Sequence, residues 1–372
     1  MKRRVFFLLL VIFFLSCKKD LPIIFGCIDQ NALNYNSLAT YNDGSCIFDT
    51  ISPHQTTPYA IVSPSGFPNM PVPENNPMTI EGVALGKKLF HDPILSGDGT
   101  QSCSSCHLQS AAFSDTNRFS QGINGSFGDR NASTIINVGW NASNFWDGRA
   151  ITLEDQAFGP VVNLIEMNNT WKNVENTLNS NAIYKDLFKK AFNIDDIDST
   201  HVVKAITQFE RTLISSNSKY DKYLRQEVQL TPSELNGYVI FNTEKGDCFH
   251  CHGTEMFMDN LFHNNGLDAE PFTDLGLAKV TGLPSDNGKF KTPTLRNIEF
   301  SFPYMHDGRF STLEEVVEHY NSGLNYSSTV DPLMKKLNIG GLQLTNQEKQ
   351  DLIAFLKALS DPDFIENPEF TP

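Results

Sequence analysis

Two short stretches decide the fold of this chain: Cys103-Ser104-Ser105-Cys106-His107 and Cys248-Phe249-His250-Cys251-His252. In a Cys-x-x-Cys-His motif the two thiols form thioethers with the vinyl groups of haem, and the histidine becomes the proximal iron ligand. Two Cys-x-x-Cys pairs can also build a four-cysteine zinc site. Zinc explains neither the histidine after each pair nor the 145 residues that separate Cys103 from Cys248. The sequence therefore predicts a c-type cytochrome with two haem c groups, attached at Cys103, Cys106, Cys248 and Cys251, with His107 and His252 as iron ligands.

The first 17 residues are typical of an export signal. Basic residues at 2–4 precede an apolar run, Val5–Leu15, which is too short to span a bilayer. Ser16 and Cys17 follow, so we expect a lipoprotein signal in which Cys17 is acylated and the lipid alone attaches the protein to a membrane. This predicts an exported protein, periplasmic or attached to the outer membrane. An ordinary secretory peptide with an incidental cysteine is the alternative.

Residues 18–73 are expected to hold a cysteine-bracketed module followed by a proline-rich linker. Cys27 and Cys46 flank an Asn/Asp-rich segment and are predicted to form a disulfide in an oxidising compartment. The polar side chains of that segment favour solvated turns, with calcium binding as the alternative. Seven prolines between Pro53 and Pro77 predict an extended linker, so we expect order to begin near Thr79.

The formal net charge of −14 argues against a nucleic-acid partner, because a polyanion is repelled by an acidic surface. An acidic surface is compatible with docking a basic redox protein. The sequence leaves the oligomeric state open, with a homodimer among the alternatives.

Helical periodicity dominates the rest of the chain, and alternating strand patterns are scarce, which predicts a mainly α fold. Capping-box signals are expected at Thr231 with Glu234 and at Ser311 with Glu314. Helices are predicted just after Thr79 and over residues 182–192, 200–213, 231–241, 311–320 and 345–359.

An internal repeat divides the chain into two related halves. Thr134-Ile-Ile-Asn137 follows the first haem motif and Thr294-Leu-Arg-Asn297 the second, and in both halves Asp-Gly-Arg begins 13 residues after the threonine. The chain therefore predicts two tandem cytochrome c-like haem domains packed against each other, at 74–217 and 218–372.

Three further motifs carry a family resemblance. Leu85–Pro93, Phe145–Ala150 and Pro303–Gly308 resemble the bacterial di-haem cytochrome c peroxidase and MauG family, and the similarity covers roughly residues 73–359. The resemblance implies that the N-terminal haem reacts with hydrogen peroxide while the C-terminal haem passes electrons. It also implies a small electron-donor protein, a cytochrome c or a cupredoxin, as partner.

The repeat also indicates which haem iron has a free coordination position. Reducing hydrogen peroxide to water takes two electrons, and one iron needs a free coordination position to bind the peroxide. Thirteen residues beyond Asp307 lies Tyr320, a potential sixth ligand of haem 2, whereas the equivalent residue beyond Asp147 is Pro160, which has no ligand atom. By the resemblance, position 320 holds methionine in typical di-haem peroxidases and tyrosine in MauG. A buried core tyrosine is the alternative for Tyr320, with His319 and Met334 as lesser candidate ligands.

The resemblance assigns further site residues. Glu166 matches the distal glutamate, and its apolar surroundings are expected to raise its pKa and suit it to proton transfer, although a surface glutamate is the alternative. Gln156 matches the distal glutamine, and Trp146 matches the tryptophan that relays electrons between the haems. A calcium site between the domains is implied, with Asn131 and the backbone carbonyls of Ser301 and Pro303 as ligands.

The loop at 119–130 lacks the histidine that closes the peroxide site in many family members. No histidine occurs between His107 and His201, and by register the missing ligand falls at Ile123. We therefore expect haem 1 to react with peroxide without prior reduction. A cytochrome-c peroxidase is the leading interpretation. The alternatives are MauG-like oxidation of a protein substrate through high-valent haems, and a non-enzymatic di-haem electron carrier.

Overall fold

The structure is a computed structural model that describes residues 23–30, 32–47 and 55–372. It divides the chain into two compact units, one ending at Gln55 and one running from Thr56 to Pro372. The expected export signal and Cys17 lie outside the described residues. Among the described helices, none is long and apolar enough to cross a membrane.

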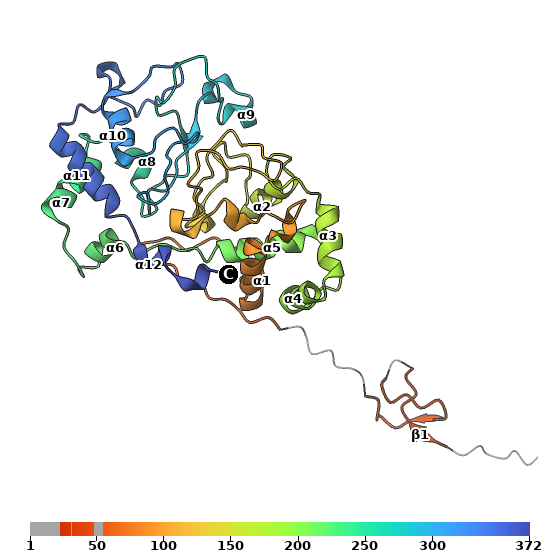
Figure 1. The fold of residues 1–372 in the computed structure, drawn as a ribbon. Coiled ribbons are helices and arrows are strands. Elements are labelled where there is room, and N and C mark those ends of the chain that lie inside the picture. The colour runs from red at the N-terminus through yellow and green to blue at the C-terminus, as the bar shows by residue number, and fades with distance from the viewer. Residues whose placement is uncertain (1–22, 31, 48–54) are drawn as a thin grey trace, which may run out of the picture. The chain divides into compact units, whose positions relative to one another are not determined.

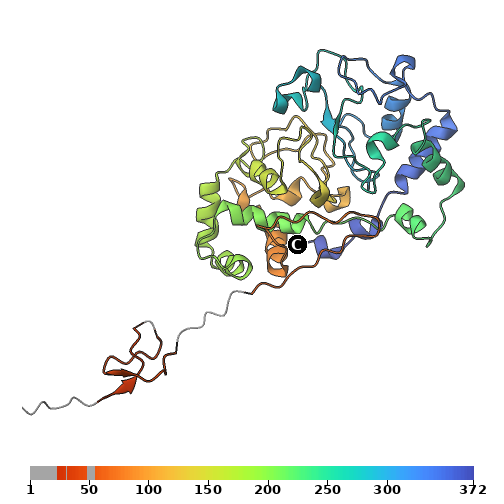
Figure 2. The same cartoon turned by 180° about the vertical axis from the view of Figure 1, so that it is seen from behind.

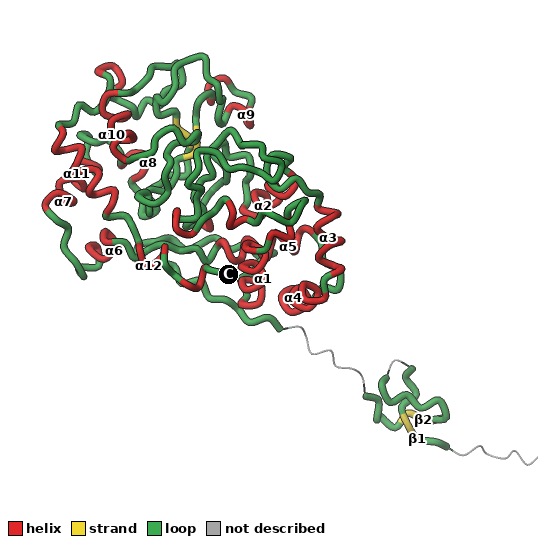
Figure 3. Tube along the Cα trace, viewed as in Figure 1, coloured by secondary structure: helices red, strands yellow, loops and turns green. Residues whose placement is uncertain are grey.

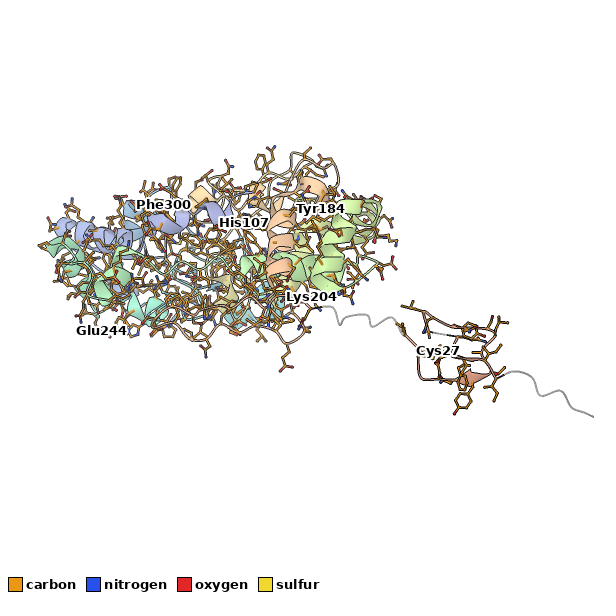
Figure 4. The ribbon with its side chains drawn as sticks, turned by 90° about the horizontal axis from the view of Figure 1, so that it is seen from below. Cys27, His107, Tyr184, Lys204, Glu244 and Phe300 are labelled. Carbon is orange, nitrogen blue, oxygen red and sulfur yellow. A yellow bond between two sulfur atoms is a disulfide. The ribbon has the colours of Figure 1, made fainter. Side chains whose placement is uncertain are left out.

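The first unit is a small module closed by a disulfide. Cys27 and Cys46 are bonded to each other (Figure 4), as predicted, next to a short parallel pair of strands, β1 (Phe25–Gly26) and β2 (Tyr41–Asn42). Asn34 accepts a hydrogen bond from the backbone of Ile47 at 2.7 Å. The side-chain oxygens of Asn36, Asn42 and Asp43 likewise accept backbone N–H groups two residues ahead. These oxygens therefore stabilise turns, which is the interpretation the sequence favoured.

The second unit is mainly helical, as predicted. Figure 1 shows α1–α5 gathered on one side and α7, α10 and α11 on the other. The helices are α1 (Ile80–His91), α2 (Leu153–Val162), α3 (Trp171–Ser180), α4 (Ala182–Phe192), α5 (Ser199–Glu210), α6 (Lys219–Leu224), α7 (Pro232–Phe241), α8 (Phe249–His252), α9 (Ala278–Thr281), α10 (Leu313–Ser322), α11 (Asn346–Lys357) and α12 (Pro362–Ile365).

Long loops join these helices and carry much of the chain, as Figure 3 shows. One short antiparallel pair, β3 (Phe262–His263) with β4 (Phe290–Lys291), lies among them. Single 3₁₀ turns punctuate the loops at η1 (Pro93–Leu95), η2 (Cys103–Ser105), η3 (Gln109–Ala111), η4 (Val138–Trp140), η5 (Pro284–Asp286), η6 (Leu337–Ile339) and η7 (Pro368–Phe370).

Each half is built around one close helix crossing. In the first half α1 packs against α5, and in the second α7 packs against α11, two pairs that can be followed from both sides in Figures 1 and 2. A Cβ atom added at Gly86 would lie 1.8 Å from the carbonyl oxygen of Ala205, and one at Gly237 would lie 1.9 Å from that of Asp351. Glycine therefore permits backbone contact at both crossings, and this correspondence extends the sequence repeat to a segment before each haem motif.

The helix termini follow the capping signals with one correction. Thr231 caps α7 and forms a capping box with Glu234, as predicted. The predicted box of Ser311 with Glu314 is wrong, because Thr312 caps α10 and its partner is Glu315. The competing signals are adjacent in sequence. Thr312 has the extended backbone of an N-cap, with φ −132° and ψ 155°, and its side chain accepts the backbone N–H of Glu315. Ser311 instead donates its backbone N–H to Glu315.

Each end of the second unit packs against residues of the other half. Phe364 of α12 and Phe370 of η7 belong to the apolar core of the first half, where both rings contact Phe113. At the other end, Met70 packs with Trp140 and with Met256 of the second half. The extended linker predicted from Pro53 to Pro77 lacks regular helices over its described residues, as expected, but order begins before Thr79. Residues from Thr56 onward belong to the second unit, and Met70 and Asn76 are buried.

Candidate functional site

The first haem motif forms a tight turn that orients His107. Residues Cys103–Ser105 make the 3₁₀ helix η2, and the backbone N–H of His107 donates to the Cys103 carbonyl at 3.0 Å. Nδ1 of His107 lies 2.9 Å from the Phe113 carbonyl, which can only accept, so the proton lies on Nδ1 and leaves Nε2 for a metal. Burial lowers the pKa of His107, which favours the neutral ring that binds iron.

The second motif repeats this arrangement on α8. Nδ1 of His252 lies 2.7 Å from the Phe257 carbonyl, and burial lowers the pKa of this histidine as well. Burial also raises the pKa of the Cys248 thiol to about 12. Cys106 lines a cavity of about 400 Å³, whereas Cys248 and Cys251 line a separate cavity of about 240 Å³. This separation excludes a shared four-cysteine zinc site. The first cavity is lined by Cys106 and His107 and the second by Cys248, Cys251 and His252, which suits a thioether-bound haem with one histidine ligand in each.

The cavity beside His107 (haem-1 cavity) lacks, among the described residues, the side chains that most often complete the coordination of a haem iron. Its described lining contains no other histidine, no methionine and no tyrosine. Pro160 lines it at the position equivalent to Tyr320, and the loop at 119–130 contributes Ser120 and residues 128–130. The backbone N–H of Ile123 bonds to the Glu166 carbonyl, and the Ile123 side chain is not part of the described lining.

Glu166 lies between the haem-1 cavity and a neighbouring cavity of about 320 Å³ that it also lines. Oε1 accepts a hydrogen bond from the Asn163 amide at 2.6 Å. Burial raises the pKa of Glu166, and the Asn163 hydrogen bond and the Arg149 charge oppose this only in part. The expected direction of the pKa shift is therefore confirmed. Gln156 lines the haem-1 cavity as well.

The cavity beside His252 (haem-2 cavity) contains Tyr320. The tyrosine lines it together with Leu313, Val316 and Val317, which lie on the same helix, α10. Its hydroxyl accepts a hydrogen bond from the Asn265 amide at 3.0 Å, and burial raises its pKa to about 12.

Other potential ligands of haem 2 differ in their position. Met334 lines the cavity, whereas His319 is buried outside the described lining. Met305 also lines it, and its sulfur lies 3.7 Å from the same Asn265 amide that bonds to Tyr320. Sequence reasoning missed Met305, although it precedes His306 in a motif that carried the resemblance.

Trp146 lies in the wall between the two cavities and lines both. Its indole N–H donates to the Asn131 carbonyl at 2.9 Å. Asn131, Ser301 and Pro303, the residues of the predicted calcium site, all line the haem-2 cavity. The structure therefore brings these three residues to one cavity wall.

Charged contacts that the sequence did not reveal join the halves next to this wall. Arg130 donates to Asp274 at 2.7 Å and to Asp147 at 2.6 Å. Burial raises the pKa of Asp274, but hydrogen bonds from Arg130 and Lys279 outweigh it and hold the pKa well below its usual range. The imidazole of His306 stacks on Phe290 with 3.6 Å between ring centroids, and burial lowers its pKa to about 4, so it is neutral. No spacing rule pairs residues so distant in sequence.

Comparison with known proteins agrees with this geometry. The family model for di-haem cytochrome c peroxidases matches residues 80–229. MauG, the methylamine utilization protein of Methylophilus methylotrophus, is 35% identical over 78% of this chain and 86% of its own. The chain belongs to the di-haem cytochrome c peroxidase and MauG family. The family carries two haem c groups, and the mainly α fold agrees with its tandem cytochrome c-like domains.

The relatives of this chain include both MauG proteins and peroxidases. Cytochrome c551 peroxidase of Nitrosomonas europaea is 36% identical over 80% of this chain and 86% of its own. Among solved structures, a MauG-like protein associated with microbial copper homeostasis is 37% identical, covers 84% of this chain and 99% of its own, and superimposes with a TM-score of 0.79. Similar identity to MauG and to a peroxidase means that identity alone does not distinguish their activities.

Proposed function

We propose that this protein reduces hydrogen peroxide to water at haem 1 with electrons from an external redox protein. The observation that carries the proposal is the asymmetry of the cavities. The described lining of the haem-1 cavity presents no histidine, methionine or tyrosine besides His107, whereas the haem-2 cavity presents Tyr320. Peroxide reduction requires one iron with a free coordination position, and a second haem can supply an electron to it.

Glu166 and Gln156 are the proposed catalytic residues. When bound, haem supplies an iron that takes up peroxide and provides electrons. The Glu166 carboxylate accepts the proton that peroxide loses on binding and returns it to the departing oxygen, and its raised pKa suits both tasks. Gln156 lies in the same cavity and is proposed to orient peroxide through its amide.

Trp146 is the proposed electron relay, because it lines both cavities and a hydrogen bond to Asn131 fixes its indole. Tyr320 is the proposed sixth ligand of haem 2. We further propose calcium at Asn131 with the carbonyls of Ser301 and Pro303, and a division into haem domains at 74–217 and 218–372.

We propose that the protein is exported and attached by a lipid on Cys17. A net charge of −14 suits an electron donor with a basic surface. If Cys17 is acylated, the protein partitions into the detergent phase and C17A releases it. An unmodified N-terminus a few residues away, found by mass spectrometry, would contradict the anchor.

MauG-like oxidation of another protein is the second candidate, favoured by Tyr320 in the haem-2 cavity. Steady-state assays of the holoprotein with hydrogen peroxide and a reduced small cytochrome c or cupredoxin distinguish the two. A peroxidase oxidises the donor at a rate that rises with peroxide concentration. Consumption of peroxide without donor oxidation favours the second candidate, and no reaction with peroxide at all leaves an electron carrier.

A further inference from the structure

The two haem cavities share a wall, and one residue in it is charged. The residues that line both cavities are Asn131, Ser133, Thr134, Trp146, Lys291, Pro293 and Thr294. The first four come from the first half of the chain and the others from the second. Lys291 is the member of this set with a formal charge.

Lys291 is fixed in this wall by its backbone. It lies on β4, and its N–H donates to the Trp146 carbonyl at 2.9 Å across the boundary between the halves. The residue is 8% exposed. Among the described residues, none forms an ion pair or a hydrogen bond with its ammonium group. Burial lowers the pKa of Lys291 to about 8, and the charge of Asp259 opposes this only in part.

Other cations of the haem-1 cavity differ from Lys291 in having protein partners. Arg130 is paired with Asp147 and Asp274, and Lys279 is paired with Asp274 at 2.9 Å. Asp259, the carboxylate that acts on Lys291, is hydrogen-bonded to His263 at 2.8 Å. A buried ammonium without a partner destabilises the folded protein. An anion next to Lys291 would remove this penalty, and the described protein groups do not supply one.

Each haem carries two propionate groups, which are carboxylates. We propose that the ammonium of Lys291 binds a haem propionate in the shared wall and acts as a counter-charge for both haems. A positive charge there stabilises the reduced, less positive form of each iron, so Lys291 raises both reduction potentials. The inference rests on both cavities holding haem c, and it does not depend on whether the electrons that reduce peroxide come from a redox protein or from another protein substrate.

The test measures reduction potentials in the holoprotein. Lys291→Gln is compared with Lys289→Gln, a matched control two residues away whose ammonium is paired with Asp286 at 3.1 Å. Each variant removes one positive charge. We expect K291Q to lower both haem potentials by more than K289Q does, and K291R to retain them. Equal shifts in K291Q and K289Q would overturn the proposal.

Two measurements guard against a variant that fails to fold. With ¹³C-labelled haem propionates, the redox-linked infrared bands of the carboxylates should shift in K291Q and not in K289Q. A crystal structure of the wild-type holoprotein should place Nζ of Lys291 about 2.7–3.2 Å from a propionate oxygen. An ammonium that faces a protein oxygen instead would refute the proposal. A protein that turns over no peroxide but shows these shifts would contradict the proposed function and leave this inference standing.

Discussion

The two halves of this protein share the backbone arrangement around the haem motif and differ at a few side chains. Each proximal histidine bonds through Nδ1 to a phenylalanine carbonyl, and both phenylalanines have positive φ, 55° at Phe113 and 53° at Phe257. The hydroxyl of Thr134 donates to the Ala112 carbonyl, and that of Thr294 donates to the Met256 carbonyl. The residues that hold the haem turn are therefore common to both halves.

The two halves differ in the helix that follows the Asp-Gly-Arg motif, α2 in the first half and α10 in the second. In both halves a threonine capping box starts the helix, at Thr152 in α2 and at Thr312 in α10. Pro160 near the end of α2 and Tyr320 near the end of α10 then face their respective cavities. A duplicated scaffold thus becomes asymmetric through a substitution that leaves the haem attachment intact.

Glu166 gives the largest expected effect. It belongs to the open cavity, so replacing it should affect the reaction of the oxidised protein with peroxide and leave haem 2 unchanged. We expect Glu166→Gln to slow that reaction by about 10²–10⁴-fold, measured by stopped-flow absorbance. Glu74→Gln is the matched control at an exposed position.

The same variant has a pH signature. Burial raises the pKa of Glu166 above 4.5, and a base acts in its ionised form. The wild-type rate should therefore rise with pH through this raised pKa, and the rise should be absent from E166Q. A rise that survives in E166Q would assign the proton transfer to another group.

A buried ion pair distinguishes the halves in stability. Arg296 corresponds to Ile136 in the repeat and donates to Asp221 at 2.8 and 3.0 Å. Asp221→Ala leaves the guanidinium buried and unpaired, and should lower the free energy of unfolding by about 3–5 kcal/mol. Urea unfolding measures this, with the exposed Asp363→Ala as control at below about 1 kcal/mol.

The pKa of Asp221 decides how the stability contributed by the Arg296–Asp221 pair depends on pH. Burial raises the pKa of Asp221, but hydrogen bonds and charge from Arg296 outweigh it and the pKa is lowered. The stability that this pair contributes is therefore present above the pKa of an unfolded aspartate and is lost as the pH falls through the folded value. Combining Asp221→Ala with Arg296→Ile should recover part of the loss, because the double variant leaves no unpaired buried charge. The equivalent position in the first half already holds an apolar residue, Ile136.

A Tyr320→Phe variant tests whether haem 2 has a sixth ligand that haem 1 lacks. Axial ligands span about 0.8 V of haem potential, so Tyr320→Phe should raise the potential of haem 2 on the order of 100 mV and change its low-spin electron paramagnetic resonance signal. Tyr326→Phe, at a position 75% exposed, is the control. An unchanged signal would move the assignment to Met305 or Met334, which line the same cavity.

The helix caps give the smallest effect. Thr152→Ala and Thr312→Ala should each lower the free energy of unfolding by about 1 kcal/mol. Ser311→Ala should change it little, since Ser311 contributes only its backbone N–H to the box. Thermal unfolding measures all three, and a larger loss in S311A than in T312A would contradict the observed cap.

The sequence predicted what depends on local pattern. The haem motifs, the helix Ala182–Phe192 and the Thr231 cap follow from spacing and capping chemistry. It did not predict Met305, Lys291 or the Arg130–Asp274 pair, since their environment is created by loops that meet across the two halves. Residues 56–77 were also missed, because proline-rich segments are read as linkers even where single side chains such as Met70 are buried.

The crossing of the chain ends has a consequence for biogenesis. Phe364 and Phe370 complete the aromatic cluster around Phe113, so the first half lacks part of its core until residues 362–370 have emerged. Chains emerge at about 5–20 residues per second and domains generally fold in order of synthesis. Here the first half cannot complete its core in that order, because the two rings that close the cluster around Phe113 come from the far end of the second half.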